Sequence, residues 1–309
     1  MKDRENAMRV GFIGLGVMGL PMLENLAGRP DLDLVAFDRA AEPLKQLEGH
    51  PSFSTSLRIA SAPAEFADRE IVVTILPDST ITNAVILGSN GEAGLLNCLQ
   101  PGAMIIDMGS SNPVETGKLA QAATAKGIAL IDAPVSGAVV KARSGTLAIL
   151  VGGDDAEFQR ARPVLEAMGT AIIRSGRVGS AHAMKALNNY VYAAGLLAVS
   201  ETLAMARALD LDVEVFADVL NASSGRNVAS ETKLKQFMIP ETFAGGFALR
   251  LMEKDLRVAR SLQETTGLHA PELELCASIW RDALAELGPR ADNTEVYRHV
   301  AALRGTREG

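Results

Sequence analysis

VGFIGLGVMG, from Val10 to Gly19, joins a short apolar run to the spacing Gly14-x-Gly16-x-x-Gly19, and the helical sequence LPMLENLAG follows. In a strand–turn–helix unit, the first glycine makes the tight turn, the second lets the backbone approach a pyrophosphate, and the third lets helix and strand pack closely. The pyrophosphate then lies at the helix N-terminus, where free N–H groups favour an anion. The spacing alone is weak, but its place between a predicted strand and a predicted helix indicates a dinucleotide-binding unit.

The end of the next predicted strand supports this interpretation. LDLVAF, from Leu32 to Phe37, is typical of a strand and ends at Asp38. A carboxylate here accepts hydrogen bonds from an adenosine ribose and repels a 2′-phosphate, so Asp38 favours NAD over NADP. Arg39 leaves the alternative open, because an arginine can hold a 2′-phosphate or simply lie in solvent.

Strands and helices continue to alternate after Asp38. Predicted strands over 71–76 and 103–107 end in the polar loops Leu76-Pro77-Asp78-Ser79 and Gly109-Ser110-Ser111-Asn112-Pro113. Open α/β sheets bind ligands at this carboxyl edge, although each loop could also be simple turn chemistry. The other elements expected in this half are helices over 42–48, 63–67, 81–87, 114–126 and 154–168 and strands over 128–131 and 171–173. Together they predict an α/β Rossmann-type doubly wound sheet for residues 1–175.

The segment DAPVSGAVVKARSGTLAILVGG, from Asp132 to Gly153, ends the sheet. Ser136, Gly137 and Ala138 offer a hydroxyl and successive backbone N–H groups with little side-chain bulk, an arrangement that can clasp a carboxylate. SGTLAILVGG is expected to be a hairpin-like return strand. A domain boundary is predicted near residues 175 and 176.

A single long helix is predicted from Gly179 to Leu209, because Ala, Leu and Met dominate the stretch and no proline interrupts it. Lys185, Asn188 and Asn189 are polar groups in its first turns, and Lys185 and Asn189 share one face. A lysine beside an amide indicates chemistry, although Lys185 could also only extend to solvent. Further helices are expected over 213–221, 228–238, 247–266, 272–287 and 294–303, so residues 176–309 are predicted to form an all-α domain.

Composition argues against several classes of protein. The 309 residues suit about two domains, and a net charge of −7 with scattered basic residues argues against nucleic acid or an anionic membrane as partner. Cys98 and Cys276 form no disulfide or metal-ligand pattern, so no metal and a cytoplasmic location are expected. The first residues lack the apolar core of a secretory signal, and Lys185, Glu201 and Arg207 interrupt the long helix as a membrane span.

Four stretches together resemble the β-hydroxyacid dehydrogenase family, which includes 3-hydroxyisobutyrate dehydrogenase and tartronate semialdehyde reductase. They are GFIGLGVMGLPMLENL (Gly11–Leu26), DAPVSGAVVKARSGTL (Asp132–Leu147), VGSAHAMKALNN (Val178–Asn189) and FALRLMEKDLRVA (Phe247–Ala259). The resemblance implies a Rossmann domain followed by an interdomain helix and an all-helical domain for substrate and subunit contacts. It also implies a homodimer or homotetramer.

The resemblance implies roles for individual residues as well. The cofactor-binding residues would be Gly14, Gly16 and Gly19 at the pyrophosphate, Asp38 with Arg39 beside it at the ribose, Leu76, Pro77 and Ser110 along the path to the nicotinamide, and Lys254 at the nicotinamide end. The substrate carboxylate would contact Ser136 and Gly137, with Lys185 as catalytic acid/base and Asn189 orienting the hydroxyl. Beside these residues, Ala138 and Asn188 are expected from their position in the sequence to be further substrate contacts.

Two positions depart from the family pattern. Ala138 stands where the family commonly has a second glycine, and Ala181 stands where it often has a glycine. Neither change removes a chemical group, but the methyl group of Ala138 could alter which substrate fits.

The roles of these residues match the requirements of alcohol oxidation. The reaction needs a hydride acceptor, a base for the hydroxyl proton and an anchor for the rest of the substrate. A free lysine, with a pKa of about 10.4, is a poor base, whereas burial beside an oxidised nicotinamide favours the neutral amine. Together with this chemistry, the resemblance implies an NAD-dependent oxidoreductase acting on a small β-hydroxy carboxylic acid.

Two alternatives stay open. One is an imine reductase-like enzyme, against which Lys185 argues because such relatives usually lack the lysine. The other is a non-catalytic NAD-binding interaction protein, which would need neither Lys185 nor Asn189.

Overall fold

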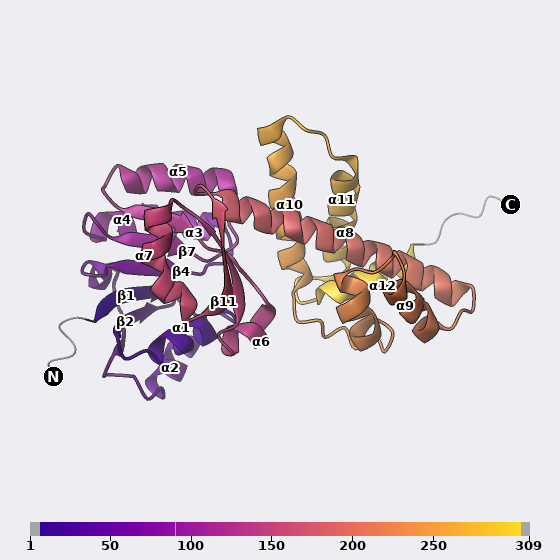
Figure 1. Cartoon of the computed structure of the whole chain (residues 1–309), viewed down its shortest axis with the longest axis horizontal. Helices are drawn as coiled ribbons and strands as arrows, with labels where there is room; N and C mark the ends of the chain where they lie inside the picture. Colours follow the sequence, from indigo (N-terminus) through magenta and orange to yellow (C-terminus); the bar gives the residue numbers. More distant parts are fainter. Residues whose placement is uncertain (1–6, 90, 304–309) are drawn as a thin grey trace. The chain divides into compact units, whose positions relative to one another are not determined.

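The computed structural model describes residues 7–89 and 91–303 and divides into two compact units (Figure 1). Unit 1 ends at Lys185 and unit 2 begins at Ala186. The division falls inside the long helix α8 (Ser180–Ala208). The boundary predicted from the sequence lies at the end of strand β11 (Gly169–Gly176), shortly before that helix.

Unit 1 is built on a nine-stranded sheet. Its strands are β1 (Met8–Ile13), β2 (Leu32–Phe37), β3 (Leu57–Ile59), β4 (Ile71–Thr74), β7 (Met104–Asp107), β8 (Ala129–Asp132), β9 (Val135–Ser136), β10 (Leu147–Gly152) and β11 (Gly169–Gly176). The order is β11-β10-β8-β7-β4-β1-β2-β3, with β9 paired to β10. All neighbouring strands from β3 to β8 are parallel. Their order in the sheet is that of a dinucleotide-binding doubly wound fold. The predicted fold class is confirmed.

Helices cover both faces of this sheet because successive strand residues point to opposite sides. Val10 and Phe12 of β1 pack in one core with α1 (Gly19–Ala27), α2 (Ala41–Glu48), α6 (Ala138–Arg143) and α7 (Asp155–Glu166). Ile13 packs in the opposite core with α3 (Ser79–Leu87), α4 (Leu95–Cys98), α5 (Pro113–Thr124) and the 3₁₀ helix η1 (Pro63–Phe66). Because the strands from β3 to β8 are parallel, their carboxyl ends lie at one edge of the sheet.

Several short elements of unit 1 differ from the prediction. The segment over 63–67 is a 3₁₀ turn rather than an α-helix. The strands β3, β5 (Gly88–Ser89), β6 (Glu92–Ala93) and β9 and the helices α4 and α6 were not predicted. Each has at most six residues, too few to show a period that separates helix from strand.

Unit 2 is helical, as predicted. After α8 it contains α9 (Val213–Ala222), the π-helix η2 (Ser230–Met238), α10 (Leu249–Thr266), α11 (Pro271–Leu287), the 3₁₀ helix η3 (Asn293–Glu295) and α12 (Val296–Ala302). Its core gathers around the fully buried Trp280. Asn227 lies just before the helical turn that leads into the π-helix, and its side-chain oxygen accepts from the N–H groups of Ala229 and Ser230.

Within the described residues, no helix is both long and apolar enough to cross a membrane. The long α8 carries Lys185, Glu201 and Arg207 along its length.

Candidate active site

The glycine-rich turn after β1 has the packing that its spacing predicts. A Cβ on Gly14 would overlap the Ile75 carbonyl, and a Cβ on Gly19 would overlap the carbonyl of Gly14, so both positions exclude any side chain. Gly14 also has a φ of +100°, which glycine adopts without steric cost. Gly16 is different, because a Cβ there would meet no atom within 4 Å. Gly16 thus borders open space at the N-terminus of α1, as a bound pyrophosphate requires.

Asp38 bridges this turn and the loop after β2. Its carboxylate accepts from the N–H of Leu15 at 2.5 Å and from the N–H of Ala40 at 2.7 Å. These two bonds orient the carboxylate and leave further lone pairs for another donor. Arg39 is exposed beside it.

The loops after β4 and β7 lie against each other. A Cβ on Gly109 would come within 3.0 Å of the Leu76 carbonyl oxygen, so the glycine allows this close approach. Leu76 and Ser110 are partly exposed, and Pro77 is exposed. The fold thus brings together three residues of the predicted cofactor path, although they come from two separate strands.

Ser136 ends β9, Ala138 begins α6, and Gly137 joins them in a sharp turn. Gly137 has a φ of +137°, and Ala138 has a φ of +56°. Ser136 and Ala138 are exposed, so the turn presents a hydroxyl and a methyl group to its surroundings. The left-handed backbone of Ala138 explains physically why a glycine suits this position.

Replacing Ala138 by glycine tests this strain. A left-handed conformation costs a non-glycine residue about 1–2 kcal/mol, and the extra flexibility of glycine in the unfolded chain offsets about 0.5–1 kcal/mol. We expect Ala138→Gly to raise the free energy of unfolding in urea by up to about 1 kcal/mol. The control Ala122→Gly, inside α5, should lower it by about 1 kcal/mol, and a similar loss at Ala138 would contradict the strain.

Lys185 lies in the second turn of α8 and is exposed along part of its side chain. Its Nζ donates to the backbone oxygen of Val135 at 2.7 Å. Val135 directly precedes Ser136, so the lysine amine is held by the residue next to the serine hydroxyl. This is the clearest grouping of predicted site residues in unit 1.

The predicted site residues of unit 2 also contact one another. Asn189 donates from Nδ2 to Oδ2 of Asp255 at 2.5 Å, and its own Oδ1 accepts from Asn188 at 3.2 Å. Lys254 pairs with Oδ1 of Asp255 at 3.1 Å. Asp255 is buried and connects Asn189 with Lys254, a role that was not predicted. The available signal was a carboxylate directly after a candidate lysine.

Unit 1 contains a second group that sequence reasoning missed. Asp107 ends β7 and Asp132 ends β8, where the two residues are paired neighbours in the sheet. Both are buried, as is His182 of α8, whose ring nitrogens lie within 4 Å of both carboxylates. From the sequence, His182 is only a residue one turn before Lys185, and a catalytic role is not favoured.

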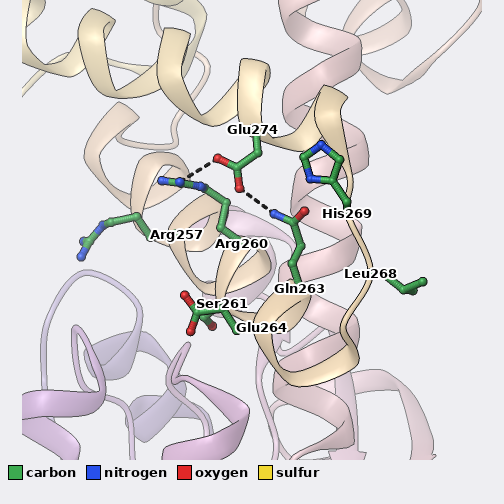
Figure 2. Close-up of a pocket in the computed structure, with 8 residues that line it drawn as sticks. All are labelled: Arg257, Arg260, Ser261, Gln263, Glu264, Leu268, His269 and Glu274. Atoms are coloured by element: carbon green, nitrogen blue, oxygen red, sulfur yellow. Dashed lines mark hydrogen bonds and ion pairs between the residues drawn. The ribbon is translucent and has the colours of Figure 1, made fainter.

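Unit 2 also contains one open hollow. It has a volume of about 470 Å³ and is lined by charged and polar side chains of α10 and α11, among them Arg257, Arg260, Gln263 and Glu274 (Figure 2). Arg260 and Gln263 both bond to Glu274, so these polar groups satisfy one another. None of the predicted site residues lines it.

The described residues hold no group of three or more His, Cys, Asp or Glu side chains arranged to bind a metal ion. Cys276 is buried, and burial raises the pKa of its thiol to about 12. The thiol therefore stays protonated at neutral pH and is no metal ligand or nucleophile there.

Family models match the chain in two consecutive segments. Residues 9–176 match the NAD binding domain of 6-phosphogluconate dehydrogenase. Residues 179–300 match the model described as NAD-binding of NADP-dependent 3-hydroxyisobutyrate dehydrogenase.

Relatives of nearly equal length share a third of the sequence. 2-(Hydroxymethyl)glutarate dehydrogenase of Eubacterium barkeri is 33% identical over 303 residues, which cover 97% of this chain and 97% of the relative. 2-Hydroxy-3-oxopropionate reductase of Escherichia coli K12 is 33% identical, with 96% and 98% covered. This chain belongs to the β-hydroxyacid dehydrogenase family.

A solved structure agrees with this assignment. 3-Hydroxyisobutyrate dehydrogenase of Mycobacterium tuberculosis, determined with L-serine, has a TM-score of 0.86 and 29% identity, covering 96% of this chain and all of the other. The resemblance seen in the sequence is confirmed. As a β-hydroxyacid dehydrogenase, the chain is an oxidoreductase with a nicotinamide cofactor.

Proposed function

We propose that this chain is an NAD-linked dehydrogenase that interconverts a small β-hydroxy carboxylic acid and its semialdehyde or ketone, with Lys185 as general acid/base. The observation that carries the proposal is the bond between Lys185 Nζ and the Val135 carbonyl, at 2.7 Å. It holds the amine beside Ser136, the predicted anchor for the substrate carboxylate. A proton carrier and an anchor at neighbouring positions are what alcohol oxidation requires.

The glycine turn fits a dinucleotide. Gly14 and Gly19 pack against backbone, while the space beside Gly16 is open, so a pyrophosphate can approach the N-terminus of α1. Asp38, oriented by its two backbone donors, would accept from the ribose hydroxyls. When bound, the nicotinamide supplies the hydride acceptor.

The residues of the chain bind the substrate and transfer the proton. Ser136 and the N–H groups of Gly137 and Ala138 bind the substrate carboxylate and fix the orientation of the molecule. Lys185 removes the hydroxyl proton during oxidation, and its ammonium form returns a proton to the oxygen during reduction. Such proton transfer contributes about 10²–10⁴-fold to a rate.

Unit 2 contributes the residues that the resemblance assigns to it. Asn189 would orient the substrate hydroxyl, with Asn188 as a further substrate contact, and Lys254 would contact the cofactor. The bonds of Asn189 and Lys254 to Asp255 support these roles, because a buried carboxylate that holds both side chains fixes their rotamers.

The relatives indicate the class of substrate. Their names describe enzymes of 2-(hydroxymethyl)glutarate, 2-hydroxy-3-oxopropionate and 3-hydroxyisobutyrate. Each substrate carries a hydroxyl or carbonyl group near a carboxylate, which suits one amine and one carboxylate anchor.

We also propose a homo-oligomer, a homodimer or homotetramer. Large apolar side chains of unit 2 are exposed, among them Val191 and Met205 on α8 and Val215 and Val219 on α9. A second copy of the chain that covered them would remove apolar surface from water.

A spectrophotometric screen of small hydroxy acids with NAD and with NADP tests the proposed activity. We expect reduction of NAD with at least one β-hydroxy carboxylate and none with amines. Activity on amines alone would favour the imine reductase-like alternative. Cofactor binding without turnover of any hydroxy acid would favour a non-catalytic NAD-binding protein.

Replacing Asp38 tests the choice of cofactor. Asp38→Asn keeps the size of the side chain and removes the charge that repels a 2′-phosphate. We expect kcat/KM for NAD to fall by about tenfold, because a hydrogen bond to a charged group contributes about 1.5–3 kcal/mol. The value for NADP should rise, since Arg39 is exposed beside the site. Arg39→Ala is the control and should leave NAD unchanged; an unaltered NAD/NADP ratio in Asp38→Asn would remove Asp38 from cofactor selection.

A further inference from the structure

A buried carboxylate holds the start of the helix that carries Lys185. Asp132 accepts the N–H of Gly179 on Oδ1 at 2.7 Å and the N–H of His182 on Oδ2 at 2.9 Å. The first N–H groups of a helix have no partner within the helix, and a negative charge near them is favourable. Here the carboxylate comes from the end of β8, far away in the sequence, and ties the helix to the sheet.

The neighbouring strand makes room for this carboxylate. Gly152 of β10 is paired with Asp132, and a Cβ at position 152 would overlap Oδ1 of Asp132. Asp132 itself has no exposed surface. The carboxylate is therefore confined to one position, and so are the two N–H groups that it accepts.

His182 extends this contact to the first turn of α5 and to the end of β7. Its Nδ1 is 2.8 Å from the hydroxyl oxygen of Thr116. The single hydrogen of that hydroxyl is donated to the Asn112 carbonyl, so the hydroxyl accepts from His182 and Nδ1 is the donor. Its Nε2 is buried, has no hydrogen-bond partner among the residues that the structure describes, and lies 3.8 Å from Oδ2 of Asp107. Asp107 in turn accepts from Ser111 and from the N–H of Gly109.

The same segment that ends in this contact also binds the lysine amine. Asp132 holds the first turn of α8, and Val135, three residues later, accepts from Lys185 Nζ at 2.7 Å. The first turn of the helix that carries Lys185 and the tip of its side chain are thus both bonded to residues 132–135, directly before Ser136.

We propose that Asp132 is a positioning residue for Lys185, with His182 linking the first turn of α8 to the first turn of α5 through Thr116. Asp132 holds the first turn of α8 so that the amine keeps one place relative to the carboxylate anchor at Ser136. The catalytic part of this statement rests on the proposed function; the fixed position of the amine does not.

Asp132→Asn is the sharpest test, because an amide has the same size but only one acceptor oxygen, and its NH₂ group would face one of the two backbone donors. We expect kcat to fall by about tenfold to about a hundredfold, as a small misplacement of a catalytic group costs, with KM for the cofactor unchanged. Competitive acetylation of the folded protein, read by mass spectrometry, should label Lys185 several-fold faster. Asp154→Asn is the matched control, since Asp154 caps α7 and asparagine is an equally good cap. This variant should change neither kcat nor the rate at which Lys185 is labelled.

Thr116→Val is the second variant, because it keeps the shape and removes the partner of His182. It should also lower kcat, by a smaller factor than Asp132→Asn. If Asp132→Asn does not fold, Thr116→Val alone tests the proposal. A wild-type chain that oxidises no hydroxy acid refutes the proposed function, while faster labelling of Lys185 in Asp132→Asn still supports its fixed position. Unchanged labelling and unchanged kcat in the folded variants would overturn the proposal, and so would faster labelling with unchanged kcat in an active enzyme.

Discussion

Lys185→Met is expected to lower kcat for the best hydroxy acid by about a thousandfold, within the range of about 10²–10⁴ that general acid/base catalysis contributes. Methionine is unbranched, forms helices well and removes only the amine. Binding of NAD, followed by protein fluorescence, should stay within about twofold, because cofactor affinity of this kind depends on the glycine turn and Asp38.

Lys118→Met is the matched control for this variant. Lys118 is an exposed lysine of α5, with 67% of its side chain accessible, and it pairs with Glu115. The same substitution there should leave kcat and NAD binding unchanged. If Lys185→Met keeps a tenth or more of the activity, Lys185 is not the proton carrier.

The glycines of the turn after β1 should separate stability from cofactor binding. Gly19→Ala forces a methyl group onto the Gly14 carbonyl and within 2.8 Å of Ile75 Cγ2. Overpacking of this kind costs about 1–3 kcal/mol, so unfolding in urea should begin at lower concentration. Gly16→Ala meets no atom within 4 Å, so it should unfold like the wild type.

Both variants should bind NAD much more weakly than the wild type, but only Gly16→Ala should do so without loss of stability. Its methyl group would occupy the space through which the pyrophosphate approaches, and we expect the Kd for NAD to rise by about tenfold or more, or about 1.4 kcal/mol. Gly117→Ala in α5, equally open, should leave Kd unchanged. Tight NAD binding by Gly16→Ala would mean that the pyrophosphate lies elsewhere.

The parts of the fold that depend on local patterns were predictable. The strand over 32–37 has the bounds that its apolar run predicts, and the glycine spacing gives the turn between β1 and α1. The long helix is also close to its predicted range, starting at Ser180, because propensity is summed over many residues. In contrast, the π-helix at Ser230–Met238 has the composition of any helix, so sequence could not distinguish it.

The contacts of the candidate site were less predictable because they join distant residues. Asp132 and His182 are fifty positions apart, as are Val135 and Lys185, and Asn189 is 66 positions from Asp255. A motif shows which residue types are present, but not which buried carboxylate accepts from which donor. Ala138 is an intermediate case: its departure from glycine was visible, whereas its left-handed backbone was not.

In the proposed reaction, the amine of Lys185 carries the proton of the substrate hydroxyl. A crystal structure of the chain with NAD and a hydroxy acid that it oxidises would show whether the amine reaches that hydroxyl. We expect Lys185 Nζ at hydrogen-bond distance, about 2.6–3.2 Å, from the hydroxyl oxygen, with the carboxylate of the substrate at Ser136. A bound substrate whose hydroxyl lies beyond the reach of Lys185, in every copy of the chain, would contradict it.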